Sequence, residues 1–349
     1  MAITYHAGRR IQGTSTDATA VTGGWKEIGR TTLGSSGDNI SVASLPDKRY
    51  LMFLTYNTAT GGSAIQRVRL NSDTGSNYAR RNSWDGGADS TATSQPQMTQ
   101  NNYALTLPTF SVGYFANKSD KEKLMTSHTI GQNTAGAGTA PNRAESTGKW
   151  ANTSNAISEV TMYNSESGSY ASGSECVVLG YDPDDTHTTN FWEELASVEL
   201  GSSSATIASG TITAKKYLWI QAFIPAANHN FNLQFNGDTG SNYAKRRSEN
   251  GGTDSTNVSQ DRMTIGSYGS TSSDFYNIFM VNNSANEKLA IIHNVNRNTA
   301  GAGNAPYRSE FVGKWANTSA QITSVNVLQQ SGGSGSFDTG SFLKVWGSN

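Results

Sequence analysis

The sequence predicts an all-β protein made of two tandem jelly-roll-like antiparallel β-sandwich domains. The prediction depends on a turn-rich composition, on a long internal repeat, and on many short segments with strand-like alternation. The 349 residues include 36 Gly but only 7 Pro, and 15% are charged, as is typical of short strands joined by tight polar turns. Helix signals are nearly absent. Residues 192–195 (Trp-Glu-Glu-Leu) align with residues 25–28 (Trp-Lys-Glu-Ile), and both segments are predicted to begin strands.

The chain contains two diverged copies of one unit. Residues 73–79 (Asp-Thr-Gly-Ser-Asn-Tyr-Ala) recur at 238–244, an offset of 165 (238 minus 73). The Asn-Thr-Ala-Gly-Ala-Gly segment at 133–138 and the Gly-Lys-Trp-Ala-Asn-Thr-Ser segment at 148–154 recur with the same offset. Outside the block from Leu70 to Val160 the offset is 167. Solenoid repeats span about 20 to 50 residues, so each copy here is a whole domain.

The repeat also sets the domain organisation. We expect an N-terminal arm over residues 1–22, a first sandwich over 23–182, a linker over 183–190 and a second sandwich over 191–349. The linker is short and polar, so the two domains are expected to lie close together.

Strand predictions for the first copy come from apolar alternation and from β-branched or aromatic enrichment between turn residues. Alternation within residues 67–70 and 157–162 predicts one buried and one wet face. The predicted strands lie near residues 25–33, 40–45, 50–57, 65–71, 77–83, 104–116, 123–131, 157–163 and 174–181.

Composition and charge exclude several classes of protein. The net charge of −1 gives no overall attraction to nucleic acid or to an anionic membrane. The single cysteine, Cys176, excludes an intrachain disulfide and is predicted to be a core residue. No apolar run reaches the length of a signal peptide or a membrane helix, so we expect a soluble chain without a classical export signal.

Carboxylates beside glycines raise the question of a metal. Asp73 and Asp238 begin the repeated Asp-Thr-Gly-Ser-Asn-Tyr segments, and residues 85–90 and Asp254 add further oxygen atoms. The spacing does not match an EF-hand, which ends in a bidentate Glu. Asp and Asn beside Gly more often cap turns through their own backbone. We therefore expect turns and no cofactor, with calcium as the alternative.

Catalytic signals are missing from the sequence. His128 and His293 occupy matching positions in predicted strands without a nearby ligand cluster, so they are interpreted as structural histidines. The Asn-Thr-Ala-Gly-Ala-Gly segments lack the Lys and the helix of a phosphate-binding loop. No nucleophile elbow or metal-ligand motif is present. The chain is therefore predicted not to be an enzyme.

One strand and turn in each copy mixes aromatic rings with cations. Such a patch could stack on a sugar or contact a neighbouring subunit, and the alternative is a solvated sheet edge protected by charge. Trp150 and Trp315, inside the repeated Gly-Lys-Trp motif, are predicted to be packing residues. The residues of the predicted patch are Tyr78, Arg80, Arg81 and Trp84 in the first copy and Tyr243, Arg246 and Arg247 in the second.

Several segments carry a resemblance to a known group of proteins. These are residues 8–17, residues 24–33, the repeated Asp-Thr-Gly-Ser-Asn-Tyr-Ala and Gly-Lys-Trp-Ala-Asn-Thr-Ser segments, and the closing Val-Trp-Gly at 345–347. Together they resemble virion structural proteins of tailed or other viruses of marine microbes. The resemblance implies a structural component of the virus particle, with no catalytic residues to carry over.

The function expected on this basis is assembly. The chain would form homo-oligomers and contact other virion proteins, in the capsid or the tail, without binding nucleic acid or membrane. Arg9 and Arg10 in the N-terminal arm would reach a neighbouring subunit. The alternative is a glycan-binding adhesin or receptor-binding protein that recognises a host surface glycan, because sandwich folds often present sugar sites on loops or a concave face.

Overall fold

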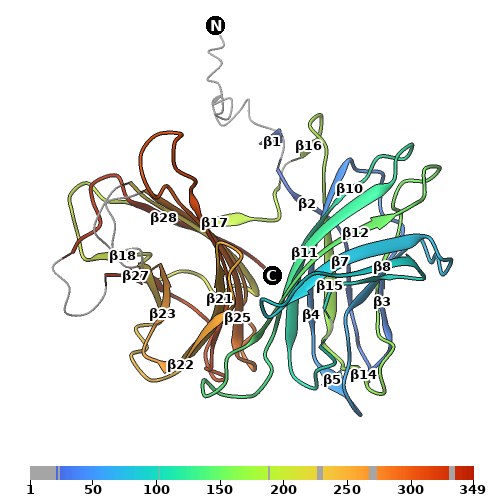
Figure 1. Cartoon of the computed structure of the whole chain (residues 1–349), viewed down its shortest axis with the longest axis horizontal. Coiled ribbons are helices and arrows are strands. Elements are labelled where there is room, and N and C mark those ends of the chain that lie inside the picture. The colour runs from blue at the N-terminus through green and yellow to red at the C-terminus, as the bar shows by residue number, and fades with distance from the viewer. Residues whose placement is uncertain are drawn as a thin grey trace, which may run out of the picture.

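The structure is a computed structural model that describes residues 21–22, 24–101, 103–187, 189–225, 231–266, 273–329 and 335–349. Regular secondary structure in these residues is β-strand throughout. The strands form two separate sandwich-like halves, which lie side by side in Figure 1. The predicted all-β fold of two jelly-roll-like sandwiches is confirmed. The predicted arm, with Arg9 and Arg10, lies almost entirely outside the described residues.

The strands of the first half and of the linker are β1 (Val21–Thr22), β2 (Lys26–Thr32), β3 (Asn39–Val42), β4 (Tyr50–Asn57), β5 (Ala59–Thr60), β6 (Arg67–Leu70), β7 (Tyr78–Trp84), β8 (Ser90–Gln95), β9 (Met98–Thr99), β10 (Thr109–Ala116), β11 (Lys123–Gly131), β12 (Asn142–Trp150), β13 (Val160–Tyr163), β14 (Ser169–Tyr170), β15 (Glu175–Tyr181) and β16 (Thr186–His187).

The strands of the second half are β17 (Glu193–Glu199), β18 (Thr206–Ala208), β19 (Tyr217–Ile224), β20 (Phe231–Phe235), β21 (Tyr243–Glu249), β22 (Ser255–Gln260), β23 (Met263–Gly266), β24 (Asp274–Val281), β25 (Lys288–Asn296), β26 (Tyr307–Trp315), β27 (Val325–Leu328) and β28 (Phe342–Ser348).

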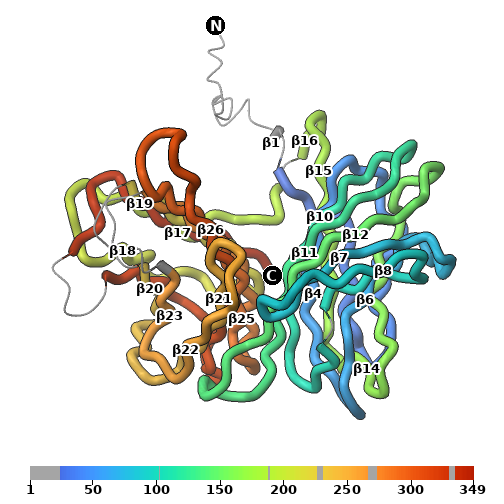
Figure 2. The backbone as a smooth tube through the Cα atoms, in the orientation of Figure 1, coloured from blue at the N-terminus to red at the C-terminus, as the bar shows by residue number. Residues whose placement is uncertain are grey.

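Each half pairs an eight-stranded with a four-stranded antiparallel sheet. The first half has the orders β2-β15-β4-β10-β11-β12-β7-β8 and β3-β13-β6-β9. The second has β17-β28-β19-β24-β25-β26-β21-β22 and β18-β27-β20-β23, which is the same order strand for strand. β1 pairs with β16, which lies within the predicted linker. Figure 2 shows the backbone of the two halves, which have this strand order in common.

The core of each sandwich lies between its two sheets. Leu51 and Phe53 of β4, in the eight-stranded sheet, belong to this core. Val68 of β6 and Val160 of β13 join them from the four-stranded sheet. Cys176 of β15 belongs to this core, and it is fully buried. Burial raises the pKa of its thiol. Cys176 is therefore a small core residue, as the sequence indicates.

The repeated motifs build one corner of each sandwich. The carboxylate of Asp73 accepts hydrogen bonds from Gly75 N (2.8 Å), Asn77 Nδ2 (2.9 Å) and Trp150 Nε1 (2.7 Å). Asp238 accepts the equivalent three bonds in the second copy. These donors hold the pKa of both carboxyls below its usual value despite their partial burial. The oxygens of Asp73 and Asp238 therefore accept hydrogen bonds from their own turn and from a tryptophan, in agreement with their interpretation as turn residues.

The glycine of the Gly-Lys-Trp motif is required by packing. A Cβ on Gly148 would lie 2.5 Å from Met98 Sδ, and one on Gly313 would lie closer still to Met263 Sδ. Both separations are far below the van der Waals contact distance, so only glycine allows β12 and β26 to pack this closely against these methionines. The tryptophans that follow, Trp150 and Trp315, are buried as predicted.

Several strands of the first half differ from expectation. β8 and β12 lie outside the segments predicted as strands, and so do the two-residue strands β1, β5, β9, β14 and β16. Residues 142–150 read Asn-Arg-Ala-Glu-Ser-Thr-Gly-Lys-Trp and lack the apolar alternation of a half-buried strand. In this strand Arg143 contacts Asp254 and Glu310 of the other domain, and Ser146 binds carbonyl oxygens of its own sandwich. Among the described residues, no helix is long and apolar enough to span a membrane.

Candidate functional site

The two eight-stranded sheets turn their outer faces towards each other. A single apolar cluster joins Leu54, Tyr56, Phe110 and Ile130 of the first sandwich to residues of the second. The partners from the second sandwich and its entry are Phe191, Trp192, Tyr217, Phe279, Val281, Leu289, Ile291 and Val312. Each large sheet is therefore buried on both faces where the domains meet, which corrects the picture of one buried and one wet face.

Strand β4 shows how the sequence encodes this arrangement. Its residues 51–56 read Leu-Met-Phe-Leu-Thr-Tyr, and every one of them is buried. Leu51 and Phe53 belong to the sandwich core, whereas Met52, Leu54 and Tyr56 belong to the cluster between the domains. A continuous apolar run is the signature of a strand that is covered on both faces.

The matched histidines meet at this interface. His293 Nε2 lies 3.2 Å from His128 Nδ1, and the ring centroids are 4.2 Å apart in an edge-on arrangement. Burial, with the nearby Arg143 charge, lowers the pKa of His128 to about 4. Burial, with His128 beside it, lowers the pKa of His293 to about 3. Both imidazoles are therefore neutral at pH 7, and one ring donates to the other.

A buried ion network lies beside the histidines. Arg143 binds Asp254 of the other domain through two hydrogen bonds, Nη2 to Oδ1 at 2.8 Å and Nε to Oδ2 at 3.2 Å. The guanidinium also contacts Glu145 and lies 3.7 Å from Glu310. Burial opposes its charge, but the bond to Asp254 and these carboxylates outweigh that effect and raise the pKa of Arg143. Burial, with Glu145 nearby, raises the pKa of Glu310.

Arg246 makes the second charged contact across the interface. Its Nε donates to the Pro141 carbonyl at 2.9 Å and lies 3.1 Å from Asp85 Oδ1. Asp85 in turn accepts a bond from the Arg143 amide at 2.7 Å. The carboxylates that the sequence offered as calcium ligands, Asp85 and Asp254, therefore bind arginines of the opposite domain.

The Asn-Thr-Ala-Gly-Ala-Gly loop of the first sandwich is docked onto the second. Lys314, which is fully buried, donates to the carbonyl oxygens of Gln132 (3.3 Å) and Thr134. The Gly136 amide donates to Glu287, which lies 3.5 Å from Lys314. The Ser259 amide donates to the Ala137 carbonyl at 2.8 Å. This glycine-rich segment thus binds protein groups of the other domain.

A further contact has no counterpart in the second copy. Glu175 accepts a 2.7 Å bond from the Tyr217 hydroxyl and pairs with Lys216 (3.0 Å) and Arg30 (3.2 Å). Burial alone would raise the pKa of Glu175, but the Thr32 hydroxyl and these cations lower it. The position equivalent to Glu175 in the second copy is Phe342.

The predicted aromatic and cationic patch does not form as a unit. Tyr78 and Tyr243 lie in the sandwich cores, where the Leu70 and Phe235 amides donate to their hydroxyls at 3.0 Å. Their assignment to a surface patch is wrong, because each ring packs on the tryptophan of its own copy. Arg246 lies in the domain interface.

The other members of that patch stay nearer the surface. Arg80 lies over the Trp84 ring at 5.8 Å, and Arg81 pairs with Asp89 at 3.2 Å. Arg247 pairs with Glu249 at 3.1 Å and lies 5.8 Å from the Phe311 ring. Within the described part of the chain, no group of three or more His, Cys, Asp or Glu side chains could hold a metal ion.

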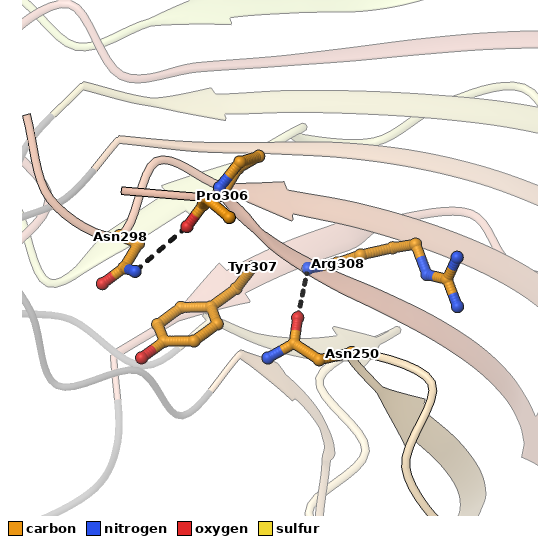
Figure 3. Close-up of a pocket in the computed structure, with 6 residues that line it drawn as sticks. Asn250, Asn298, Pro306, Tyr307 and Arg308 are labelled. Atoms are coloured by element: carbon orange, nitrogen blue, oxygen red, sulfur yellow. Dashed lines mark hydrogen bonds between the residues drawn. The ribbon is translucent and has the colours of Figure 1, made fainter. Parts of the chain in front are cut away.

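The surface formed by the described residues includes two hollows of interest. The first is lined by Asn250, Ala305, Pro306 and Arg308 with their neighbours, and Figure 3 shows Arg308 extending away from the ring of Tyr307. The second is an aromatic cleft on the first sandwich. Its residues are Trp25, Tyr50, Leu51, Tyr114, Phe115, Ala116, Leu124, Met125, Thr126 and Tyr181.

Sequence reasoning missed the interface residues, although two signals pointed to them. The first is the apolar run 51–56. The second is the repetition of His128 at His293, which the structure explains as one contact between equivalent strands. Arg143, Glu287 and Lys314 gave no such signal, because charged side chains are usually exposed.

No protein-family model and no curated protein sequence matches this chain. Among solved structures, domains LG4-5 of the mouse laminin α1 chain are similar at 12% identity and a TM-score of 0.21, with coverage of 93% of this chain and 91% of that one. The attachment invasion locus protein Ail of Yersinia pestis is similar at 6% identity and a TM-score of 0.13, with coverage of 77% and 98%. TM-scores this low do not establish a common fold, so the fold assignment follows from the chain's own sheets.

Proposed function

We propose that this protein is a non-enzymatic structural component of a virus particle, on the capsid or associated with the tail, that works through self-assembly and contacts with other virion proteins. The observation that carries the proposal is that both faces of each large sheet make apolar contacts. Each sandwich folds around one face of its large sheet and offers the opposite, apolar face to another sandwich. Stable interfaces between subunits are likewise more apolar than other protein surfaces, and their repetition around symmetry axes builds an assembly.

The chemistry of the interdomain surface supports the same proposal. Its histidines are neutral and contact each other, and its carboxylates are bound by arginines. The segments kept in both copies form turns, core tryptophans and a docking loop. These groups hold surfaces together. The resemblance of several of these segments to virion proteins points in the same direction.

A glycan-binding role is the second candidate, and the observation that favours it is the aromatic cleft on the first sandwich. Trp25 lies 6.1 Å from Tyr114 and 5.9 Å from Tyr181, centroid to centroid. Rings in such an arrangement can stack on sugar faces. The lining offers few polar groups besides tyrosine hydroxyls and Thr126, whereas sugar recognition needs several convergent hydrogen-bond partners.

The test of the proposed function is the composition of virus particles. Particles purified by density gradient from a lysed culture of cells that carry the gene are analysed by quantitative mass spectrometry. We expect the chain in the particle band at a constant ratio to the major particle protein. Its recovery only in the fraction free of particles would overturn the proposal.

A further inference from the structure

The two sandwiches contact each other through non-equivalent surfaces. The first contributes a loop surface, formed by Asp85, residues 132–141 and Arg143. The second contributes a receiving surface, formed by Arg246, Asp254, Glu287 and Lys314, with Tyr217 and Leu289 beside them. Because the copies have the same fold, each sandwich carries both surfaces. In the part of the chain that the structure describes, the second loop surface and the first receiving surface do not take part in the contact between the sandwiches.

The unused loop surface lies on the second sandwich. Its residues 298–303 have the same sequence as residues 133–138. Ala137, Ala140 and Pro141 are buried by the docking in the first copy, whereas residues 299–306 are exposed in the second. The side chain of Arg143 is 5% exposed in its bond to Asp254, whereas that of its equivalent, Arg308, is 62% exposed.

The unused receiving surface lies on the first sandwich and keeps the same charged residues. Lys314 and Glu287 correspond to Lys149 and Glu122, which pair at 2.9 Å on the surface. The Lys314 side chain is fully buried, whereas that of Lys149 is 47% exposed. Asp254 and Arg246 correspond to Asp89 and Arg81, which are also exposed.

The apolar parts of the two unused surfaces match as well. Phe110 stacks on Tyr217 within the chain, with ring centroids 6.2 Å apart. Their equivalents are Phe275 on the second sandwich and Tyr50 on the first. Leu289 is fully buried, whereas its equivalent Leu124 is 56% exposed. The aromatic cleft around Tyr50, Tyr114 and Leu124 is thus the uncovered copy of a surface that is covered on the second sandwich.

The other hollow lies on the second sandwich and is equivalent to a covered surface of the first. In the first sandwich, that surface is formed by Asp85, Pro141 and Arg143, and it is covered by Arg246 and Asp254 of the second sandwich. The equivalent positions are Asn250, Pro306 and Arg308, which line the hollow in Figure 3. Asn250 accepts a hydrogen bond from the Arg308 amide at 2.9 Å, as Asp85 does from the Arg143 amide. The shape of the site is therefore preserved.

We propose that a second copy of this chain occupies these surfaces, so that the loop surface of the second sandwich in one molecule docks onto the receiving surface of the first sandwich in the next. The inference rests on the proposed assembly function and names the surfaces that carry it. Arg308 would bind Asp89, and residues 298–303 would lie on Lys149 and Glu122. Such a head-to-tail contact is heterologous, so it builds a ring if the rotation closes and an open array if it does not.

The contact between molecules is expected to be weaker than the contact within the chain. Leu54, Val112 and Val177 in the first sandwich correspond to Gln221, Asn277 and Lys344 in the second. Replacing apolar by polar groups reduces the apolar area removed from water. Association should therefore be reversible and should depend on protein concentration.

The test is a charge exchange between two full-length variants, followed by sedimentation velocity over a range of concentrations. Arg308→Asp and Asp89→Arg each place like charges across the proposed contact. We expect each variant alone to associate about tenfold or more weakly than the wild type. An equimolar mixture should associate again. In the mixture, the carboxylate introduced at position 308 of one variant meets the guanidinium introduced at position 89 of the other, and the unaltered Arg308 meets the unaltered Asp89.

Both positions are exposed in the single molecule, so both variants should fold. Glu166→Arg, beside the four-stranded sheet, is the matched control and should associate like the wild type.

Three results would overturn this inference. These are a wild type that stays monomeric at all concentrations, single variants that associate like the wild type, and a mixture that does not recover. Binding of a glycan array by a monomeric wild type, lost in Tyr114→Ala, would assign the cleft to sugar instead. None of these results touches the presence of the chain in virus particles, so the proposed function fails or survives on its own measurement.

Discussion

His128 and His293 occupy the same position in the two copies and contact each other, with His293 Nε2 3.2 Å from His128 Nδ1. Equivalent residues meet because the equivalent strands β11 and β25 face each other where the sandwiches pack. The charged contacts around this pair nevertheless join non-equivalent residues, such as Arg143 with Asp254. The two sandwiches thus meet at the equivalent strands β11 and β25 but are shifted relative to each other. Because of this shift, the loop surface of the second sandwich and the receiving surface of the first stay outside the contact.

The histidine pair predicts an acid-sensitive interface. The pKa of each imidazole is near its usual 6.5 when the domains separate or unfold, but about 4 and about 3 when they are packed. The open state therefore binds more protons, so stability present at pH 7 is lost as the pH falls from about 6.5 towards 4. The loss should be on the order of a few kcal/mol.

Denaturant unfolding at pH 7.0, above the window of these shifts, and at pH 5.5 and 4.5, within it, measures the effect. The control is the double variant His128→Gln with His293→Gln, whose stability should change less over the same range because the two interface imidazoles no longer titrate. Equal pH dependence for the wild type and the double variant would contradict the prediction.

Arg143→Met should destabilise the packed domains by about 3–5 kcal/mol, because the buried Asp254 carboxylate loses its closest cation and keeps only Arg246, 3.9 Å away. Arg308→Met is the matched control in the second copy. It removes an exposed guanidinium and should cost less than about 0.5 kcal/mol. Thermal unfolding at micromolar concentration compares the two, and similar costs would show that Arg143 is not buried in the interface.

Much of this structure could be predicted from the sequence. The register of the repeat indicates two copies of one strand order, and the turn residues around Asp73 and Asp238 form the same corner in both. The sequence predicts that the domains lie close together, but not which surface of each copy makes the contact. The segments at 133–138 and 298–303 are identical, yet one is docked and the other is exposed. Burial of this kind depends on the placement of a whole domain, which a local sequence does not contain.

Substitution of Asp73 or of Asp238 should lower the stability of its own sandwich by a similar amount. Asp73→Ala removes the acceptor of the buried Trp150 indole N–H, and Asp238→Ala does the same for Trp315. Each should cost about 1–3 kcal/mol, the penalty for an unsatisfied buried donor. Differential scanning calorimetry of the two variants measures the costs. A stability unchanged in either variant would contradict the assigned role.

The two identical loops should differ in susceptibility to protease. Residues 299–306 are exposed, whereas Ala137, Ala140 and Pro141 in the first loop are covered by the second sandwich. Of the two loops, we expect subtilisin to cut residues 298–306 of the single molecule before residues 133–141, since exposed loops are the preferred sites of nicking. Mass spectrometry of the early fragments identifies the site. First cleavage within residues 133–141 would contradict the docked position of that loop.

We propose that this chain builds particles by repeating its internal domain contact between molecules. Cryo-electron microscopy of purified particles tests this proposal most directly. We expect density for this chain in which residues 298–303 of one copy lie against Lys149 and Glu122 of the next, as residues 133–138 lie against Lys314 and Glu287 within the chain. Particles in which the chain is absent, or in which this receiving surface faces solvent, would contradict the proposal.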